Sequence, residues 1–590
     1  MSDWQICFLA ASVWCGALVP FGLPIVARAA VVVFAIAAWR LRRPLLLTAS
    51  LALLASAGAA AAWSDAVEPV AERTFVGEAT LASDPIPNRG GVRVALSIEG
   101  RQYEASAWGS PAGWLRNRLM GEQVFVEARL RPLDDPPSWI IARGTRGRAT
   151  IASVDGFSEG RIHTRIANSI RRTIESGASS MSRNERSLLT GLVYGDDRLQ
   201  SPLTADNFTA AGLSHLLAVS GQNVAFVLAL ASPALRRLRH RQRFLAVLCV
   251  IGLFATVTRF EPSVVRASVM TGVAATGALV GTAVPARRVL LLAISVLVVV
   301  SPLIVHSTAF QLSLAASGGI LLWSQRVALS IPGPRSLANA LAVTATAQFA
   351  VAPLLLWRFD GLPVASLPAN LLAGPAAGPV MMWGLVAGWL AGLVPGWLAE
   401  VLHVPTRLLI GWIDGVAALA ARLPLADLDI AHVVVIGLAG AAALRIVGAR
   451  RRFAMFGVVV GALLAPAVVS HVTPPPPVVS IDAQSSIVHR DGRVLVEVDP
   501  SSRPERVLAA LRRARVGDID LIIVRRSSFA MADLIGWIDS RHHVATVWAP
   551  ELTMGVGEQV PEPGDRVSIG GSMLRPVVTE DRLLLTVVGE

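Results

Sequence analysis

The chain has 590 residues, of which 53% are hydrophobic and only 16% are charged, and its mean hydropathy is +0.56. Soluble domains carry about 25% charged residues, so this composition excludes a large soluble enzyme and indicates a membrane-embedded chain with attached soluble parts. Basic residues exceed acidic ones by 12, and since the sequence has no lysine, every basic residue in that count is arginine. A P-loop needs a lysine on its phosphates, which excludes an ATPase motif of that kind.

Residues 1–63 contain three apolar stretches, from about Trp4 to Val19, from Pro24 to Trp39 and from Pro44 to Ala62. A cleaved signal peptide is the alternative, but the first residues lack its basic region and two further apolar stretches follow. We therefore expect three transmembrane helices. Three arginines, Arg40, Arg42 and Arg43, separate the second from the third.

Residues 74–152 change to short alternating segments such as Val92 to Ile98 and Gln123 to Ala128, separated by turn residues. This pattern predicts a small all-β domain, comparable to a five-stranded barrel. It has 10 arginines against 8 acidic residues, too small an excess for a basic nucleic-acid module. Its arginines and tryptophans would still suit binding of single-stranded nucleic acid, although aromatic residues in a small barrel more often belong to the core. The residues concerned are Arg143, Arg146, Arg148, Trp108, Trp114 and Trp139.

Residues 153–180 form a connecting segment in which Ile162, Ile166, Ile170 and Ile174 lie four apart, with arginines off this stripe. The spacing predicts an amphipathic helix. We expect a linker helix that lies on the membrane surface.

Residues 181–471 are a succession of apolar segments divided by prolines. Arginine clusters at 40–43, 236–243, 287–288 and 450–452 fall on one side of the membrane if the chain makes about thirteen crossings, the last from Phe453 to His471. Arginine-rich connections lie on the cytoplasmic side of membrane proteins. The pattern therefore predicts a multi-pass protein of the cell membrane whose two soluble domains both face away from the cytoplasm.

Residues 472–477 are a proline-rich linker, and residues 478–590 alternate strand-like and helix-like segments. We expect strands at 478–481, 494–498 and 521–524 and a helix at 503–515, which make a short α/β domain.

The densest group of polar residues in an apolar segment comprises His215, Ser220, Gln222 and Asn223, with Gly221 among them. Polar residues in membrane spans face a partner helix, a cavity or a path, and the glycine permits a broken helix. From these residues alone, interhelical hydrogen bonding and a polar path are both open.

This segment, His215 to Val224, with the run Gly191 to Asp197 before it, resembles the signature of the ComEC family, the membrane channels of bacterial DNA uptake. Further similar pieces follow in order at 262–267, 310–313, 347–353 and 367–372. The resemblance implies an N-terminal OB-like domain, a transmembrane channel domain and a C-terminal metallo-β-lactamase-like domain. It also implies import of single-stranded DNA in natural transformation, with an extracytoplasmic DNA receptor and a cytoplasmic ATPase as partners.

The similar pieces add further candidate residues for the DNA path, namely Arg266, Gln311, Ser313, Gln348 and Asn370. Arg266 in a span should face protein or water, where it either binds phosphates or pairs with Glu261 or Asp360. The uncharged side chains either line a wet path or hold helices together.

The C-terminal domain departs from the family at its metal-binding loop. Many members carry a T-H-x-x-x-D-H-x-G-type loop after a strand, and aligning Asp533 and Gly536 with it places Phe529 and Leu534 at the histidine positions. One carboxylate does not make a hydrolytic metal centre. We expect a degenerate domain without nuclease activity, no metal or other cofactor, and no enzyme activity.

Three functions are therefore compared. The first is a channel for import of single-stranded DNA across the cytoplasmic membrane. The second is a membrane-tethered nuclease or hydrolase, against which the missing histidines argue. The third is a transport protein for another substrate.

Overall fold

The structure is a computed structural model of the whole chain. It describes residues 2–445 apart from 69, 89, 134–139, 141–142, 360, 424–426 and 429, then residue 461 and residues 476–588 apart from 491, 553–554, 563–564, 566, 570–571 and 580–581. The expected last span apart from residue 461, most of the proline-rich linker and the arginines at 450–452 lie outside the described residues. The chain divides into two units. Unit 1 comprises residues 1–199, 215–354 and 373–412, and unit 2 comprises residues 200–214, 355–372 and 413–590.

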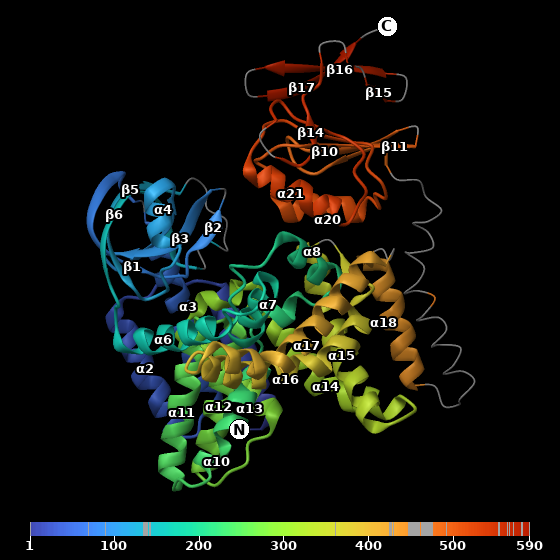
Figure 1. The fold of residues 1–590 in the computed structure, drawn as a ribbon. Helices are drawn as coiled ribbons and strands as arrows, with labels where there is room; N and C mark the ends of the chain where they lie inside the picture. Colours follow the sequence, from blue (N-terminus) through green and yellow to red (C-terminus); the bar gives the residue numbers. More distant parts are fainter. Residues whose placement is uncertain are drawn as a thin grey trace. The chain divides into compact units, whose positions relative to one another are not determined.

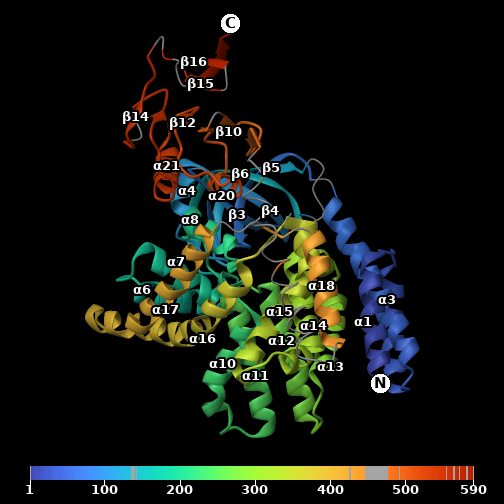
Figure 2. The same cartoon turned by 90° about the vertical axis from the view of Figure 1, so that its right-hand side faces the viewer.

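Three helices begin unit 1, where three were expected: α1 (Asp3–Leu18), α2 (Ile25–Arg40) and α3 (Pro44–Val67). The side chains of Ser2 and Gln5 cap the start of α1, and Pro44 occupies the first turn of α3. Figure 2 shows α1 beside α3. Leu9 and Val13 of α1 and Ala55 of α3 share a buried apolar cluster with the later helix α13 (Ala286–Val300).

A closed sheet follows (Figure 1). Its strands are β1 (Arg73–Leu81), β2 (Ile86–Asn88), β3 (Gly91–Ile98), β4 (Arg101–Ala107), β5 (Gln123–Pro132) and β6 (Thr145–Ser158), with helix α4 (Gly109–Leu115) between β4 and β5. The order is β1-β5-β6-β4-β3, and β1 pairs with β3 to close the ring, while β2 extends from β3. In this sheet β4 and β6 pair in parallel, and the other pairings of its described strands are antiparallel. The alternating apolar residues fill the interior, and β6 continues past residue 152, where the domain was expected to end.

Helices make up the rest of unit 1. They are α6 (Ile162–Gly177), α7 (Arg183–Tyr194), α9 (Ser214–Leu217), α10 (Gly221–Leu235), α11 (His240–Val257), α12 (Pro262–Leu279), α13 (Ala286–Val300), η1 (Pro302–His306) and α14 (Thr308–Ser330), with parts of α15 (Arg335–Phe359), α16 (Ser366–Ala391) and α17 (Gly396–Arg422). Among the described residues, α3, α11, α15, α16 and α17 are long and apolar enough to cross a membrane. The chain is a polytopic helical membrane protein, and the number of crossings stays a prediction.

Helix α6 forms where expected, and its buried face combines polar and apolar side chains. Ile162 and Ile166 are exposed and Ile170 is half-buried, whereas Ile174 is buried together with Asn168 and Arg171. The isoleucine stripe therefore packs inward only toward the C-terminal end of the helix, beside a buried polar row that includes Arg171.

Unit 2 contains α8 (Pro202–Ala210), the short strands β7 (Leu362–Pro363) and β8 (Asp427–Leu428), and α18 (Ile430–Arg445). Its C-terminal part has a six-stranded sheet of order β14-β13-β12-β11-β10-β9 and a three-stranded sheet of order β15-β16-β17. The strands are β9 (Val478–Ser480), β10 (Ser486–Arg490), β11 (Arg493–Val498), β12 (Leu521–Val524), β13 (Val547–Trp548), β14 (Glu558–Gln559), β15 (Val567–Ile569), β16 (Ser572–Thr579) and β17 (Arg582–Val588). Helices α20 (Pro504–Arg513) and α21 (Phe529–Asp539) pack on one face of the larger sheet. The three strands and the helix expected here are all present.

Candidate functional site

The helix break predicted around Gly221 is present between α9 and α10. Residues 218–220 are not helical, and Ser220 caps α10 by accepting a hydrogen bond from the Gln222 backbone N–H at 3.3 Å. The Ser220 hydroxyl also donates to Asn223 Oδ1 at 3.0 Å. Asn223 is buried and donates through Nδ2 to the Leu192 carbonyl at 3.2 Å. Ser220 and Asn223 thus hold the break against α7.

Arg266 of α12 meets this break from the other side. A Cβ added at Gly221 would lie 3.1 Å from Arg266 Nη2 and 3.0 Å from the Ala267 Cβ, so only glycine fits here without a shift. Three residues before Arg266, Ser263 donates a hydrogen bond to the Val219 carbonyl. Glycine at a helix crossing permits this close approach in membrane bundles.

The Arg266 guanidinium is buried, with 8% exposure, and donates to the Ser317 hydroxyl of α14. Its Nε is buried and makes no hydrogen bond. Among the described residues it forms no ion pair, so the pairing with Glu261 considered from the sequence is not present, and Asp360 lies outside the described residues. A buried guanidinium held by one hydroxyl is costly unless an anion or water completes its shell.

The other predicted path residues do not join this group. His215 and Gln222 are exposed beside the break. Gln311 donates through Nε2 to the Val305 carbonyl at 2.7 Å, and its Oε1 is buried without a hydrogen bond. Asn370, in unit 2, donates to the Ser366 carbonyl of its own helix at 2.8 Å. Ser313 and Gln348 are half-buried on α14 and α15.

A small cavity adjoins Asn223. Its volume of about 10 Å³ has room for roughly one water molecule. Val193, Phe226, Phe254 and Met381 are among the side chains around it. At this point the break borders a single-water cavity rather than a wide opening.

A buried ion network that the sequence did not reveal joins the β-barrel to the helices of unit 1. Arg171 of α6 is 1% exposed and reaches Asp84 of the β1–β2 turn at 2.9 Å and Asp196 at 2.5 Å. Arg259, in the turn between α11 and α12, binds both oxygens of Asp84 at 2.8 and 3.0 Å. Arg198 pairs with Asp196 at 2.5 Å. The one available signal was the Gly195, Asp196, Asp197 run before the signature.

This network changes the pKa values of its carboxyl groups. Burial would raise the pKa of Asp84, but the charges of Arg171 and Arg259 outweigh burial and lower it to about 2. Burial raises the pKa of Glu175, and the negative charge of Asp196 adds to the rise. Asp84 is therefore ionised across the physiological range and holds the two arginines together.

The outer surface of the barrel carries aromatic side chains beside an arginine. The Arg118 guanidinium lies 3.7 Å from the centre of the Phe157 ring and 5.6 Å from that of Trp114. Phe157 and Trp114 are about half-exposed, as is Trp108. Arg146, in contrast, is buried and pairs with Glu68 at 3.0 Å and with Asp65, so it serves the barrel rather than a surface site. Trp139 lies outside the described residues.

Comparison with known proteins places this geometry in a family. The family described as Competence protein matches residues 192–454, which include all ten predicted path residues and the Arg266 contact. The ComE operon protein 3 of Bacillus subtilis (strain 168) is 27% identical over 369 residues, which are 59% of this chain and 47% of that protein. Residues 192–454 therefore belong to the Competence protein family, and the Bacillus match supports a ComEC-family protein.

The match to the Bacillus ComEC relative spans about half of that protein's length. No solved structure matches the chain. The residues that the structure brings together are Ser220, Gly221, Asn223 and Arg266, and all four lie inside the matched family region.

Proposed function

We propose that this chain is the membrane channel that imports single-stranded DNA across the cytoplasmic membrane in natural transformation. The observation that carries the proposal is Arg266: a buried guanidinium, without an ion pair among the described residues, at a helix break inside the competence region. A phosphate group of a passing strand is an anion that would complete its shell. Uncharged side chains such as Ser317 and Ser220 would bind the strand only weakly, which suits conduction, since several fixed charges would trap a polyanion.

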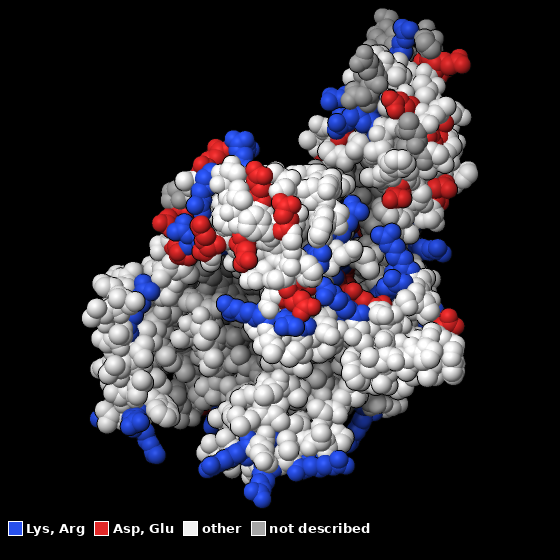
Figure 3. Space-filling model, turned by 60° about the vertical axis from the view of Figure 1, so that its left-hand side comes forward, with Lys and Arg blue, Asp and Glu red and all other residues white. Residues whose placement is uncertain are grey.

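The arrangement of unit 1 supports the predicted sides of the membrane. Asp3 pairs with Arg287 and Arg288, both at 2.5 Å, at one end of α12 and α13. Asp84 of the barrel pairs with Arg259 at the opposite end of α11 and α12. Exposed arginines gather where α10 and α11 are joined, at the end away from Arg259 (Figure 3). We propose that this basic end is cytoplasmic and the barrel extracytoplasmic.

We propose that the barrel is an OB fold that guides the strand. Its closed five-strand order, with one parallel pair and a helix before the fourth strand of the ring, supports that assignment. The Trp114, Arg118 and Phe157 side chains would offer ring and guanidinium faces to unpaired bases.

We also propose that the C-terminal domain is a metallo-β-lactamase-like domain that has lost its metal site. The residues aligned with the metal-binding histidines do not fit a metal: Leu534 is in the core of the domain and Phe529 is a phenylalanine exposed to 85%. Asp533 lies exposed on α21. Among the described residues, no three His, Cys, Asp or Glu side chains lie together. Without its own P-loop, the chain would depend on a cytoplasmic ATPase to pull the strand and on an extracytoplasmic receptor to deliver it.

Substitutions of Arg266 test the channel. Arg266→Gln should lower the transformation frequency about tenfold or more, since a charge-assisted hydrogen bond contributes about 1.5–3 kcal/mol. Arg266→Lys should give an intermediate value, because lysine keeps the charge without the bidentate fork. Arg241→Gln, at the exposed α10–α11 connection, is the matched control. Normal transformation by Arg266→Gln, at normal protein level in the membrane, would refute the role of Arg266.

A further inference from the structure

The second face of the C-terminal sheet is only partly covered. Side chains alternate along a strand, so Arg493 and Leu495 of β11 share a face with Leu521 of β12 and Trp548 of β13. Helices α20 and α21 pack on the opposite face, where Val496 and Ile522 point. On the second face, Leu583 of β17 packs with Leu495, Leu521 and Ile523.

The β17 strand covers one end of this face. The Leu583 backbone N–H donates to the Arg525 carbonyl at 2.9 Å, which fixes β17 at the carboxyl end of β12. A pocket of about 190 Å³ remains toward the amino ends of the strands. Typical pockets for drug-sized ligands exceed about 300 Å³, so this one suits a single ring system.

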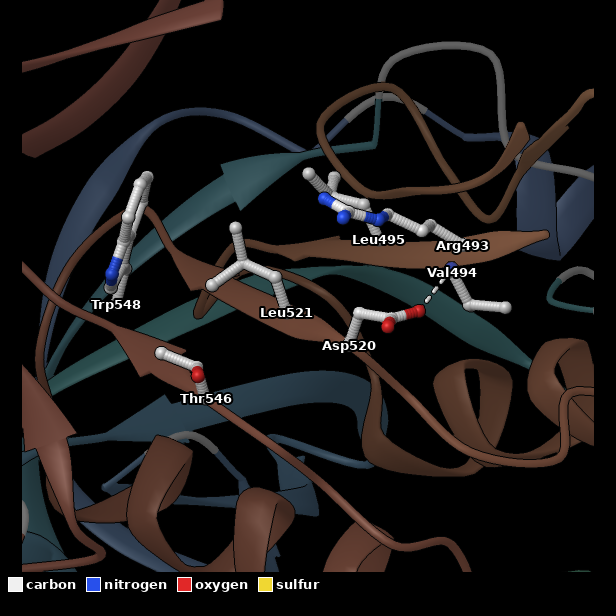
Figure 4. Close-up of a pocket in the computed structure, with 7 residues that line it drawn as sticks. All are labelled: Arg493, Val494, Leu495, Asp520, Leu521, Thr546 and Trp548. Atoms are coloured by element: carbon white, nitrogen blue, oxygen red, sulfur yellow. Dashed lines mark hydrogen bonds between the residues drawn. The ribbon is translucent and has the colours of Figure 1, made fainter. Parts of the chain in front are cut away.

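The pocket has an apolar floor between an aromatic and a cationic wall (Figure 4). Leu495 and Leu521 are buried and form the floor, with Trp548 on one side and Arg493 on the other. Asp520 and Thr546 complete the lining, and Asp520 Oδ2 accepts a hydrogen bond from the Val494 backbone N–H at 2.8 Å.

Arg493 is the charged group that distinguishes this pocket from ordinary core. Its side chain is exposed, and it forms no ion pair with any residue in the described part of the chain. Asp520 is exposed at the entrance as well, and one of its oxygens is already held by the Val494 N–H. The pocket therefore offers a ring surface, an acceptor and an uncommitted cation in one place.

We propose that this pocket binds a nucleobase together with its adjoining phosphate. The base would stack on Trp548 over Leu495 and Leu521, as bases stack on aromatic side chains in single-strand-binding proteins, and Arg493 would bind the phosphate. This inference rests on the proposed function, and it gives the C-terminal domain a DNA-holding role in place of a hydrolytic one. A nucleobase with a phosphate occurs both in a DNA strand and in a free nucleotide.

Photocrosslinking of the full-length protein in detergent tests the pocket locally. The probe is a thymidine oligomer that contains 5-iododeoxyuridine, and crosslinked peptides are identified by mass spectrometry. We expect a crosslink on the peptide that contains Trp548, with a yield reduced about tenfold by Arg493→Ala. Trp548→Phe should retain binding and Trp548→Ala should lose it. Arg506→Ala is the matched control. This exposed arginine belongs to α20, which packs on the face of the sheet opposite the pocket, so its loss should leave the crosslink yield unchanged.

A second arm separates the two sources of the ligand. Unlabelled competitors are compared by how far they reduce the crosslink yield per nucleotide. If thymidine 5′-monophosphate competes as strongly as the unlabelled oligomer, the pocket binds free nucleotides. If only the oligomer competes, the pocket binds the DNA strand. Crosslinks confined to other peptides, or a Trp548 crosslink insensitive to Arg493→Ala, would overturn the proposal. Transformation is measured in parallel on cells that lack the gene, which tests the proposed function independently of the pocket. If import requires the gene but no crosslink forms at the pocket, only the pocket proposal fails.

Discussion

The residue with the largest structural consequence in unit 1 is Asp84, since its carboxylate lies between Arg171 and Arg259. Asp84→Asn should destabilise the protein by about 3–5 kcal/mol, because it leaves two buried arginines short of an anion. Thermal unfolding in detergent measures this, with Glu127→Gln on the exposed face of β5 as the control. An unfolding temperature equal to that of the control would show that the network is dispensable.

The pH dependence of the same carboxylate has a definite sign. The pKa of Asp84 is lowered from 3.8 to about 2, so its stabilising effect is complete above pH 3.8 and is lost as the pH falls through about 2. The wild-type unfolding temperature should fall over this window by more than that of Asp84→Asn. Parallel curves for the two proteins would contradict the assigned shift.

Gly221 tests the close approach at the helix break. Gly221→Ala places a Cβ 3.0 Å from the Ala267 Cβ and 3.1 Å from Arg266 Nη2, so α10 and α12 must separate. We expect a loss of stability of about 1–3 kcal/mol and a matching loss of transformation. Gly252→Ala is the control, because no atom lies within 4 Å of its added Cβ and alanine favours a helix. Equal behaviour of the two variants would refute the close contact.

At the scale of elements, α8 connects to the C-terminal part of unit 2 through a buried carboxylate. Asp206 binds Arg541 at 2.6 Å and Arg512 at 3.5 Å, and its side chain is 1% exposed. Asp206→Asn should loosen α8 from α20 by about 3–5 kcal/mol, seen as faster hydrogen exchange in both helices. Asp427→Asn, whose 3.8 Å contact with Arg513 is partly exposed, should have little effect. Unchanged exchange in α8 would contradict a docking role for Asp206.

Elements with a strong local pattern were predictable from the sequence. The three N-terminal helices, the alternating strands of the barrel and the strand at 521–524 follow directly from the apolar pattern. The burial of Arg171 on α6 was not predictable, since it depends on Asp84 and Asp196, which meet it from distant parts of the chain. A stripe of isoleucines shows which residues are apolar, and not which partner is available.

The candidate site was predictable in part for the same reason. The signature located Ser220, Gly221 and Asn223 as neighbours in sequence, and the resemblance supplied Arg266. The sequence left phosphate, Glu261 and Asp360 open as partners of Arg266. In the structure the guanidinium donates to Ser317 of α14, a contact between distant helices that no local sequence pattern predicts. Gln311 instead donates to the Val305 carbonyl of the preceding η1, and Asn370 donates to a carbonyl of its own helix.

At the scale of the whole molecule, the arginine distribution predicts which parts face the cytoplasm. In a variant with Cys7, Cys15 and Cys249 replaced by alanine, single cysteines can be placed by Thr150→Cys in the barrel, Asp533→Cys on α21 and Arg241→Cys in the first turn of α11. An impermeant maleimide should label the first two in intact cells and the third only after lysis. Labelling of Arg241→Cys in intact cells would reverse the proposed orientation.

The most direct measurement of the proposed function follows labelled DNA into the cytoplasm of competent cells. Cells without the gene should bind DNA at their surface and contain no labelled single strand inside, and the wild-type gene should restore entry. Cells with Arg266→Gln, at normal protein level, should also bind DNA at their surface but contain less internal label than wild-type cells. Equal amounts of internal label in cells with and without the gene would contradict the channel.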